Sequence, residues 1–495
     1  MEGLFRPLDY AVLIAYIAGV TAFGAFLGRR QRGARDYFLA GRDIPWWAIC
    51  FSVVATETSA LTFISVPATA YTGDFWFLQL AFGYLLGRIA IAALLLPRYF
   101  RGELVTVYQL LEQRFGLLTR RFASVIFMVT RAFADSVRIF AAAIPITLIT
   151  GAPYWQSILI TGVFTLVYTY FGGLRAVVWV DVVQMGLYVI GGVAALVVIH
   201  GLLPDGWSAI TGAAAAGDKF RVIHLEGGFA STRWLVTGIV GGGFLSMASH
   251  GVDHLIVQRL LASGSLSHAR RAIIGSGVLV IGQFTLFLFV GAALFAYYGG
   301  RTFQELGLTA ADEIFPRFIV EGLPPGLSGL IVAGILAAMM STVSSSLNSL
   351  ASATTHDLYA PLAGQHDEDH LMRVGKRFTL LWAVILIGGA MLFRFVQQGQ
   401  PVVVIALQIA SFTYGGLLGG FLLGIVSRRA EQRDAILGMA TAIVVMAGLW
   451  AIQQFGLVTP FVDTLWFALI GSTITVIVGL ISSRLRGART PAGVA

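Results

Sequence analysis

Long apolar segments alternate with short polar stretches along the whole chain. A helix of about 20 apolar residues crosses the hydrocarbon core of a bilayer, and thirteen segments of the 495-residue chain reach a spanning length. These segments are residues 8–28, 46–72, 75–97, 122–150, 153–171, 176–200, 233–257, 271–298, 326–355, 377–395, 401–426, 434–453 and 461–482. The pattern predicts an all-α membrane protein with thirteen transmembrane helices.

Two of the predicted spans contain polar residues or glycines in their middle, where a membrane helix is normally apolar. The span 46–72 contains Thr56, Glu57, Thr58, Ser59, Thr62 and then Pro67. The span 233–257 contains three adjacent glycines and then Ser246, Ser249, His250 and Asp253. Transporters built from inverted repeats bind solute where helices are interrupted in this way, so both spans are candidate binding elements.

Each interrupted span is the first of five consecutive spans, and two groups of five face opposite ways across the membrane. We therefore expect inverted repeats at residues 46–200 and 233–429. An extra span and an inner loop precede them at 1–45, an outer loop separates them at 201–232, and two further spans with a tail follow at 430–495.

Positive charge is distributed unequally over the loops. With the amino terminus outside, 23 of the 33 Lys and Arg residues fall in inner loops and seven in outer loops. Because cytoplasmic loops carry the excess of Lys and Arg, we expect an outside amino terminus and a cytoplasmic carboxyl terminus in a cell membrane. The net charge of +8 is then a topology signal and predicts no nucleic-acid partner. Only 12% of residues are charged, about half the share in soluble domains.

The second half of the span 326–355 is rich in hydroxyl groups. Nine of the fifteen residues from Ser341 to Thr355 are Ser or Thr. Ala338, Ser341 and Thr342 are spaced i, i+3 and i+4, which brings a carbonyl and two hydroxyls to one helical face. Such neutral oxygens suit a small hard cation. The alternative is a small-residue face that packs against another helix.

The predicted span 122–150 carries three charges on one helical face. Arg131, Asp135 and Arg138 are spaced i, i+4 and i+7. Charged side chains inside a membrane are costly and mark a functional hypothesis. Either Asp135 pairs with the arginines and fixes the bundle, or one arginine binds an anionic solute. Arg88, in the span before, is a further charge to which the sequence gives no role.

Four motifs together resemble the sodium:solute symporter family, which includes sodium–glucose, proline and sialic acid transporters. They are TYFGGLRAVVWVDVVQ at 169–184, GVDHLIVQRLLA at 251–262, MMSTVSSSLNS at 339–349 and SFTYGGLLGGFLLGI at 411–425. The second motif departs from the family pattern at Val252 and His254. The resemblance covers about residues 8–429 and implies a LeuT-type core of two inverted five-helix repeats that couples sodium entry to solute uptake.

The resemblance also implies sodium sites. The main site would use carbonyls of Ala55, Thr58 and Ala338 and the hydroxyls of Ser341 and Thr342. Some members have a second sodium site, which here would comprise Asp181, Ser341, Ser344 and Ser345. The alternative for Asp181 is a structural ion pair with an arginine.

The solute is expected at the middle of the membrane, between the interrupted helices and their neighbours. Arg138 resembles the arginine that receives a carboxylate in sialic acid transporters. The predicted solute-binding residues are Glu57, Ser59, Thr62, Phe75, Gln79, Arg138, Asp253, Gln408 and Thr413. A sugar or a sugar acid such as sialic acid is the first choice of solute, with an amino acid or a monocarboxylate as the alternative.

The expected partners are a sodium ion, a small polar solute and the lipid bilayer, with the chain working as a monomer by alternating access. A proton-coupled transporter of the same fold is a rival, with Glu57 or Asp135 as the proton carrier. A membrane sensor is a second rival, although no loop forms an attached soluble domain. A membrane enzyme is a third rival. Its only candidate acid–base group is Glu57 with His250 or His254, and we expect no enzyme.

Overall fold

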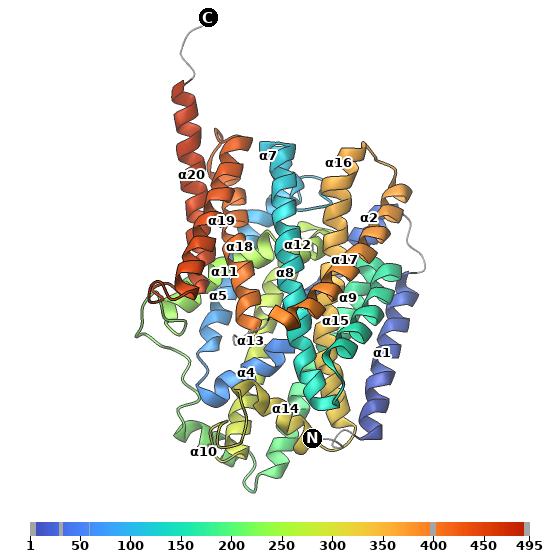
Figure 1. The fold of residues 1–495 in the computed structure, drawn as a ribbon, viewed down its shortest axis with the longest axis vertical. Helices are drawn as coiled ribbons and strands as arrows, with labels where there is room; N and C mark the ends of the chain where they lie inside the picture. The colour runs from blue at the N-terminus through green and yellow to red at the C-terminus, as the bar shows by residue number, and fades with distance from the viewer. Residues whose placement is uncertain (1–5, 29–32, 59, 397–401, 490–495) are drawn as a thin grey trace, which may run out of the picture.

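The computed structural model describes residues 6–28, 33–58, 60–396 and 402–489. It is a bundle of helices (Figure 1). In these ranges the only β-structure is an isolated bridge between Ile44 and Ser263. The predicted all-α class is therefore confirmed.

The first half of the chain forms α1 (Pro7–Leu27), α2 (Gly33–Leu39), η2 (Ala40–Arg42), α3 (Trp46–Glu57), α4 (Ala60–Thr72), α5 (Phe77–Ala90), η3 (Ile91–Leu95), α6 (Leu96–Tyr99), α7 (Gln109–Phe115), α8 (Leu117–Thr150), α9 (Tyr154–Leu202) and α10 (Trp207–Ala216). The second half forms η4 (Thr237–Gly241), α11 (Gly242–Gly251), α12 (His254–Leu261), α13 (Leu266–Tyr297), η5 (Ala311–Glu313), α14 (Ile314–Glu321), α15 (Leu327–Ala353), η6 (Thr354–Tyr359), α16 (Ala360–Ala363), α17 (Glu368–Val396), α18 (Val402–Val426), α19 (Gln432–Gln454), η7 (Thr464–Trp466) and α20 (Phe467–Arg489).

The predicted count of thirteen spans is not confirmed. Eight helical segments of the described chain are long and apolar enough to cross a membrane, and a ninth span is formed if α3 and the part of α4 from Thr62 to Thr72 are counted together. The axes of this pair differ by 65°. The predicted spans 153–171 and 176–200 correspond to the two helical parts of α9, which meet at a kink at Gly173 without an intervening loop.

Helix α15 is the central element of the bundle. In its most apolar window 89% of residues are buried, compared with 17% for α1 and 22% for α17. It packs against α9, α8, α1 and α17. The small Ala, Ser and Gly residues of α15 let the neighbouring helices pack closely around it. Its hydroxyl-rich half therefore faces protein and not lipid.

The glycines of η4 and α11 let this broken segment pack directly on α5. A Cβ atom added at Gly83 would lie 2.3 Å from the carbonyl oxygen of Gly238, and one added at Gly87 would lie 2.3 Å from that of Gly243. Backbones can approach this closely only where both surfaces lack side chains. The second interrupted span is therefore held against α5, which is the helix that follows the first interrupted span.

The two ends of the bundle carry different elements. Helices α2, α7 and α16 and the carboxyl end of α20 lie at the upper end in Figure 1, and α10 and α14 lie at the lower end. The predicted inner loops that contain α2, α7 and α16 therefore belong to the upper end.

Candidate functional site

The predicted main sodium site lies on α3 and α15, two helices that contact each other. Helix α3 ends at Glu57, and Thr58 adopts an extended conformation with φ −74° and ψ 102°. The last carbonyls of a helix have no intrahelical donor, so the break leaves backbone oxygens in the last turn, which includes Ala55. The Thr58 hydroxyl donates to the Val54 carbonyl at 2.8 Å.

The α15 residues of this site present their oxygens inside the protein. Ser341 and Thr342 are buried, and the Thr342 hydroxyl donates to the Ala338 carbonyl at 3.1 Å. The Ser341 hydroxyl donates to Asp181 at 2.7 Å. Hydroxyl and carbonyl oxygens on two adjoining helices form the kind of ligand set that a hard cation takes. The assignment to sodium stays a prediction.

Asp181, the carboxylate of the predicted second site, is fully buried, and of the three predicted serines Ser341 is the one that bonds to it directly. Besides the bond from Ser341, Ser344 and Ser345 both donate to the Ser341 carbonyl, at 3.1 and 2.6 Å. Arg259 also reaches this cluster, donating to Asp181 at 3.2 Å and to the Ser345 hydroxyl. The alternative prediction that Asp181 pairs with an arginine is confirmed, within the cluster that the sodium prediction names.

Sequence reasoning missed Ser52 and Arg259 as members of this cluster. Ser52 donates to Asp181 at 2.5 Å and accepts from Arg259 at 2.8 Å. Arg259 falls between the predicted spans 233–257 and 271–298, where an inner loop is expected, but it is fully buried in α12. Its position in the GVDHLIVQRLLA motif, beside a run of apolar residues, was the signal that could have identified it.

A second buried network joins α8, α12 and α18. Arg131 donates to Asp253 through Nε at 2.9 Å and to the Tyr414 hydroxyl at 2.6 Å, and Tyr414 donates to Asp253 at 2.8 Å. The other oxygen of Asp253 caps α12 by accepting from the Leu255 amide at 2.9 Å. Asp253, a predicted solute residue, thus has both of its oxygens bound within the protein.

Arg138 lies at the edge of this network. It contacts Asp135 at 3.3 Å, and its side chain is 23% exposed. Asp135 also contacts Arg131 at 3.3 Å and accepts from Ser346 at 2.5 Å. Because Asp253 binds Arg131 closely, Arg131 and Arg138 face two carboxylates, and the Arg138–Asp135 pair is longer and more exposed than the Arg131–Asp253 pair.

Comparison with known proteins identifies the chain. The model of the sodium:solute symporter family matches residues 37–442. The chain belongs to this family. It is similar to the sodium/sialic acid symporter NanT of Aliivibrio fischeri, at 29% identity over 97% of this chain and 93% of the relative. It is also similar to the sodium/sialic acid symporter SiaT of Proteus mirabilis, at 30% identity over 97% of this chain and 96% of the relative.

A solved structure supports the same assignment. The substrate-bound outward-open state of a Na+-coupled sialic acid symporter superimposes with a TM-score of 0.85 at 28% identity, covering 97% of this chain and 98% of the other. The predicted family, the LeuT-type fold and the sodium-coupled symport activity are therefore confirmed. A membrane enzyme is excluded because members of the family are transporters.

In this symporter Glu57 bonds to Arg88, the charge to which the sequence gave no role. The contact is an ion pair at the break between α3 and α4, and His250 lies 3.4 Å from the same carboxylate oxygen. Arg88 is fully buried and also donates to Ser276 at 2.8 Å. Its neutralisation by Glu57 fixes α5 to the broken span.

The remaining solute predictions fall in different places. Phe75 stacks edge-on with Phe220 and Phe289, and Gln79 bonds to loop backbone, so both contact the outer loop. Thr62 is partly buried on α4 and Thr413 is buried on α18. Two predicted residues, Ser59 and the side chain of Gln408, lie outside the described part of the chain.

Proposed function

We propose that this symporter imports an acidic sugar of the sialic acid class. The observation that carries the proposal is the geometry of Arg138, whose ion pair with Asp135 is long and whose side chain remains partly exposed. A guanidinium in this state can bind a second carboxylate with parallel hydrogen bonds. The sialic acid transport of the two relatives supports the same class of solute.

We infer that two sodium ions accompany the solute. The first binds at the break in α3, to the carbonyls of Ala55, Thr58 and Ala338 and the hydroxyls of Ser341 and Thr342. The convergence of these elements supports it.

The second ion binds at Asp181 with the hydroxyls of Ser341, Ser344 and Ser345. The Asp181 carboxylate supplies a formal charge for the ion. One carboxylate oxygen accepts from Ser341, and the other accepts from Arg259 at 3.2 Å. The novel Na+-site named for the similar solved structure is consistent with an additional ion.

We further propose that the protein lies in the cell membrane with its amino terminus outside and its carboxyl terminus in the cytoplasm. The excess of Lys and Arg at one end of the bundle supports this orientation. A monomer surrounded by lipid is the proposed transporting unit.

The test is the sodium-dependent binding of N-acetylneuraminate to the purified protein. Hydrogen bonds to a charged group contribute about 1.5–3 kcal/mol, so Arg138→Gln should weaken binding roughly 10- to 150-fold. Arg377→Gln, which removes an exposed arginine of α17, should leave the affinity unchanged. Equal binding of a neutral amino sugar without the carboxylate, or wild-type affinity in Arg138→Gln, would contradict the proposal.

A further inference from the structure

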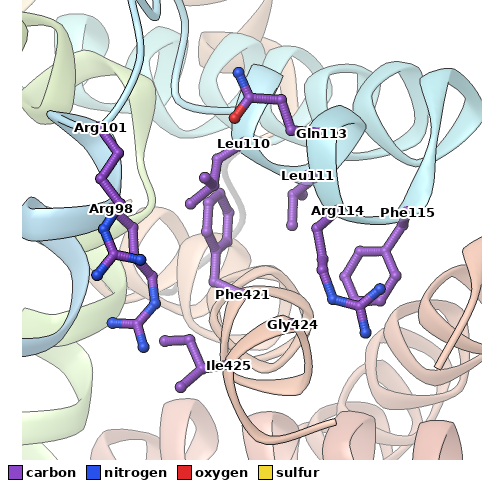
Figure 2. Close-up of a pocket in the computed structure, with 10 residues that line it drawn as sticks. All are labelled: Arg98, Arg101, Leu110, Leu111, Gln113, Arg114, Phe115, Phe421, Gly424 and Ile425. Atoms are coloured by element: carbon purple, nitrogen blue, oxygen red, sulfur yellow. The ribbon is translucent and has the colours of Figure 1, made fainter. Parts of the chain in front are cut away.

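A cavity of about 220 Å³ lies between α6, α7 and α18 at the arginine-rich end of the bundle. Its walls contain none of the proposed sodium or solute residues. Figure 2 shows Arg98 and Arg101 side by side, with Arg114 on the far side of an apolar strip that includes Phe421. The cavity is smaller than the roughly 300–1,000 Å³ of pockets that enclose a whole drug-sized ligand. It therefore fits a small group of a larger molecule.

The three arginines of the cavity lack a neutralising carboxylate. No Asp or Glu lines the cavity, and none of the three arginines forms an ion pair with a carboxylate of the described chain. Arg98 donates to the Leu94 carbonyl, and Arg114 donates to the Ser427 carbonyl while its guanidinium lies 4.7 Å from the centre of the Phe115 ring. Guanidinium groups bind phosphate with paired hydrogen bonds, so the charge of this cavity favours a phosphate.

The rest of the wall is apolar and continues to the surface of the bundle. Leu110, Phe421 and Ile425 form the strip between the arginines. Leu94 and Val426, which are close in sequence to the lining residues Arg98 and Ile425, are 42% and 64% exposed. Exposed apolar side chains on a membrane helix face acyl chains, whereas a site for a soluble anion would not be bordered by such a surface.

We propose that this cavity binds the phosphate headgroup of an anionic phospholipid whose acyl chains lie along Phe421 and Ile425. The proposal uses the orientation inferred above, in which this end of the bundle faces the cytoplasm. The cytoplasmic leaflet carries anionic lipids, and basic pockets between membrane helices on that side bind their headgroups. The site is separate from the transported solute, so its occupancy is independent of the solute assignment.

Lipid titration followed by native mass spectrometry tests this proposal. Purified protein in a neutral detergent is titrated with phosphatidylglycerol and, separately, with phosphatidylcholine of the same acyl chains. We expect tighter binding of phosphatidylglycerol, and a loss of roughly fivefold in its affinity for each arginine removed. The double variant Arg98→Gln/Arg101→Gln should therefore lose about 25-fold and keep only the small preference that Arg114 supplies.

The control variant is Arg373→Gln/Arg377→Gln, which removes two exposed arginines of α17 at the same end of the bundle. It should keep the preference for phosphatidylglycerol. Arg98→Lys/Arg101→Lys retains the charges and should keep part of the preference even if the glutamine variant folds poorly. Sodium-dependent binding of N-acetylneuraminate, measured in parallel, should be unchanged in all three variants.

Three results would overturn the proposal. The first is equal affinity of the wild-type protein for the two lipids. The second is an equal loss in the control variant, which would indicate a diffuse charge effect. The third is competition by inorganic phosphate or glycerol phosphate at the concentration at which the lipid binds, which would identify the occupant as a soluble phosphate.

Discussion

Single residues inside the bundle are organised by paired charges. A charged side chain in an apolar interior is costly unless it is neutralised and hydrogen bonded. The described interior meets this condition with several buried ion pairs. They include Glu57–Arg88, Arg120–Asp357, Arg131–Asp253, Arg131–Asp135, Asp135–Arg138 and Asp181–Arg259. We expect the buried pairs to hold the helices together. We expect the longer, partly exposed Asp135–Arg138 pair to be available to a ligand.

The Glu57–Arg88 pair yields a stability prediction. Arg88→Gln removes the partner of a buried carboxylate and should lower the free energy of unfolding by about 3–5 kcal/mol. The double variant Glu57→Gln/Arg88→Gln leaves no unpaired charge and should recover most of the loss. Thermal unfolding in detergent, measured for both single variants and the double variant, gives the coupling. Additive losses would show that the two side chains do not interact.

The sequence reveals these charges but not all of their partners. It places Arg131, Asp135 and Arg138 on one helical face, and the structure keeps them together. It does not identify Asp253 as the partner of Arg131, because the two residues are 122 positions apart and meet only when α8 packs near α12. For the same reason Arg88 had no predicted role. Local spacing is readable from a sequence, whereas contacts between distant helices depend on the bundle.

Individual elements owe their shape to a few backbone positions. Helix α9 runs over 49 residues and changes direction at Gly173, whose φ of 52° and ψ of −155° are accessible almost only to glycine. The sequence predicts two spans here, 153–171 and 176–200, and the helical parts of α9 on either side of Gly173 correspond to them. The same reasoning located the break after α3 correctly, since polar residues inside an apolar run are a local signal. In the second interrupted span the helix runs through the three glycines, and the break lies at Val252 and Asp253, between α11 and α12.

Gly173→Ala tests the bend of α9. A side chain in this backbone region is strained, so the variant should be less stable by roughly 1–3 kcal/mol. Gly186→Ala in the same helix is the matched control, because a Cβ atom added there meets no atom within 4 Å. Alanine should leave stability unchanged or raise it by up to about 1 kcal/mol there. Equal melting temperatures for the two variants would contradict the assigned strain.

The outer loop between α10 and η4 is tied to α5 by Gln79. The Gln79 amide donates to the Arg233 carbonyl at 2.9 Å and accepts from the His224 amide at 3.1 Å. Lys219 adds a further tie, donating to the Tyr71 carbonyl at 2.7 Å, and burial lowers the pKa of its ammonium group. These contacts explain the burial of Gln79 without a solute.

Gln79→Leu should release this loop. Both backbone groups would lose a partner, and hydrogen exchange of the amides in residues 221–235 should become faster. The reason is local, so exchange in α15 should stay unchanged. If Gln79 binds solute instead, the variant would lose affinity for N-acetylneuraminate while the loop keeps its protection. Hydrogen exchange by mass spectrometry with a parallel binding assay distinguishes these results.

At the scale of the whole molecule, the proposed stoichiometry determines how strongly solute is concentrated. Two sodium ions and one singly charged acid carry one net positive charge inward. A tenfold sodium gradient supplies about 1.4 kcal/mol per ion and a potential of ~100 mV about 2.3 kcal/mol for the net charge. The total of about 5 kcal/mol sustains a solute ratio of roughly several thousand. One sodium ion with the same acid would move no net charge.

The most direct test of sodium-driven transport is the uptake of labelled N-acetylneuraminate into proteoliposomes. An inward sodium gradient should drive uptake, and an inside-negative potential should accelerate it because net positive charge enters. Potassium should not replace sodium, and an inward proton gradient alone should drive nothing. Uptake driven by the proton gradient in the absence of sodium would contradict the account and favour a protonated carboxylate as the coupling group.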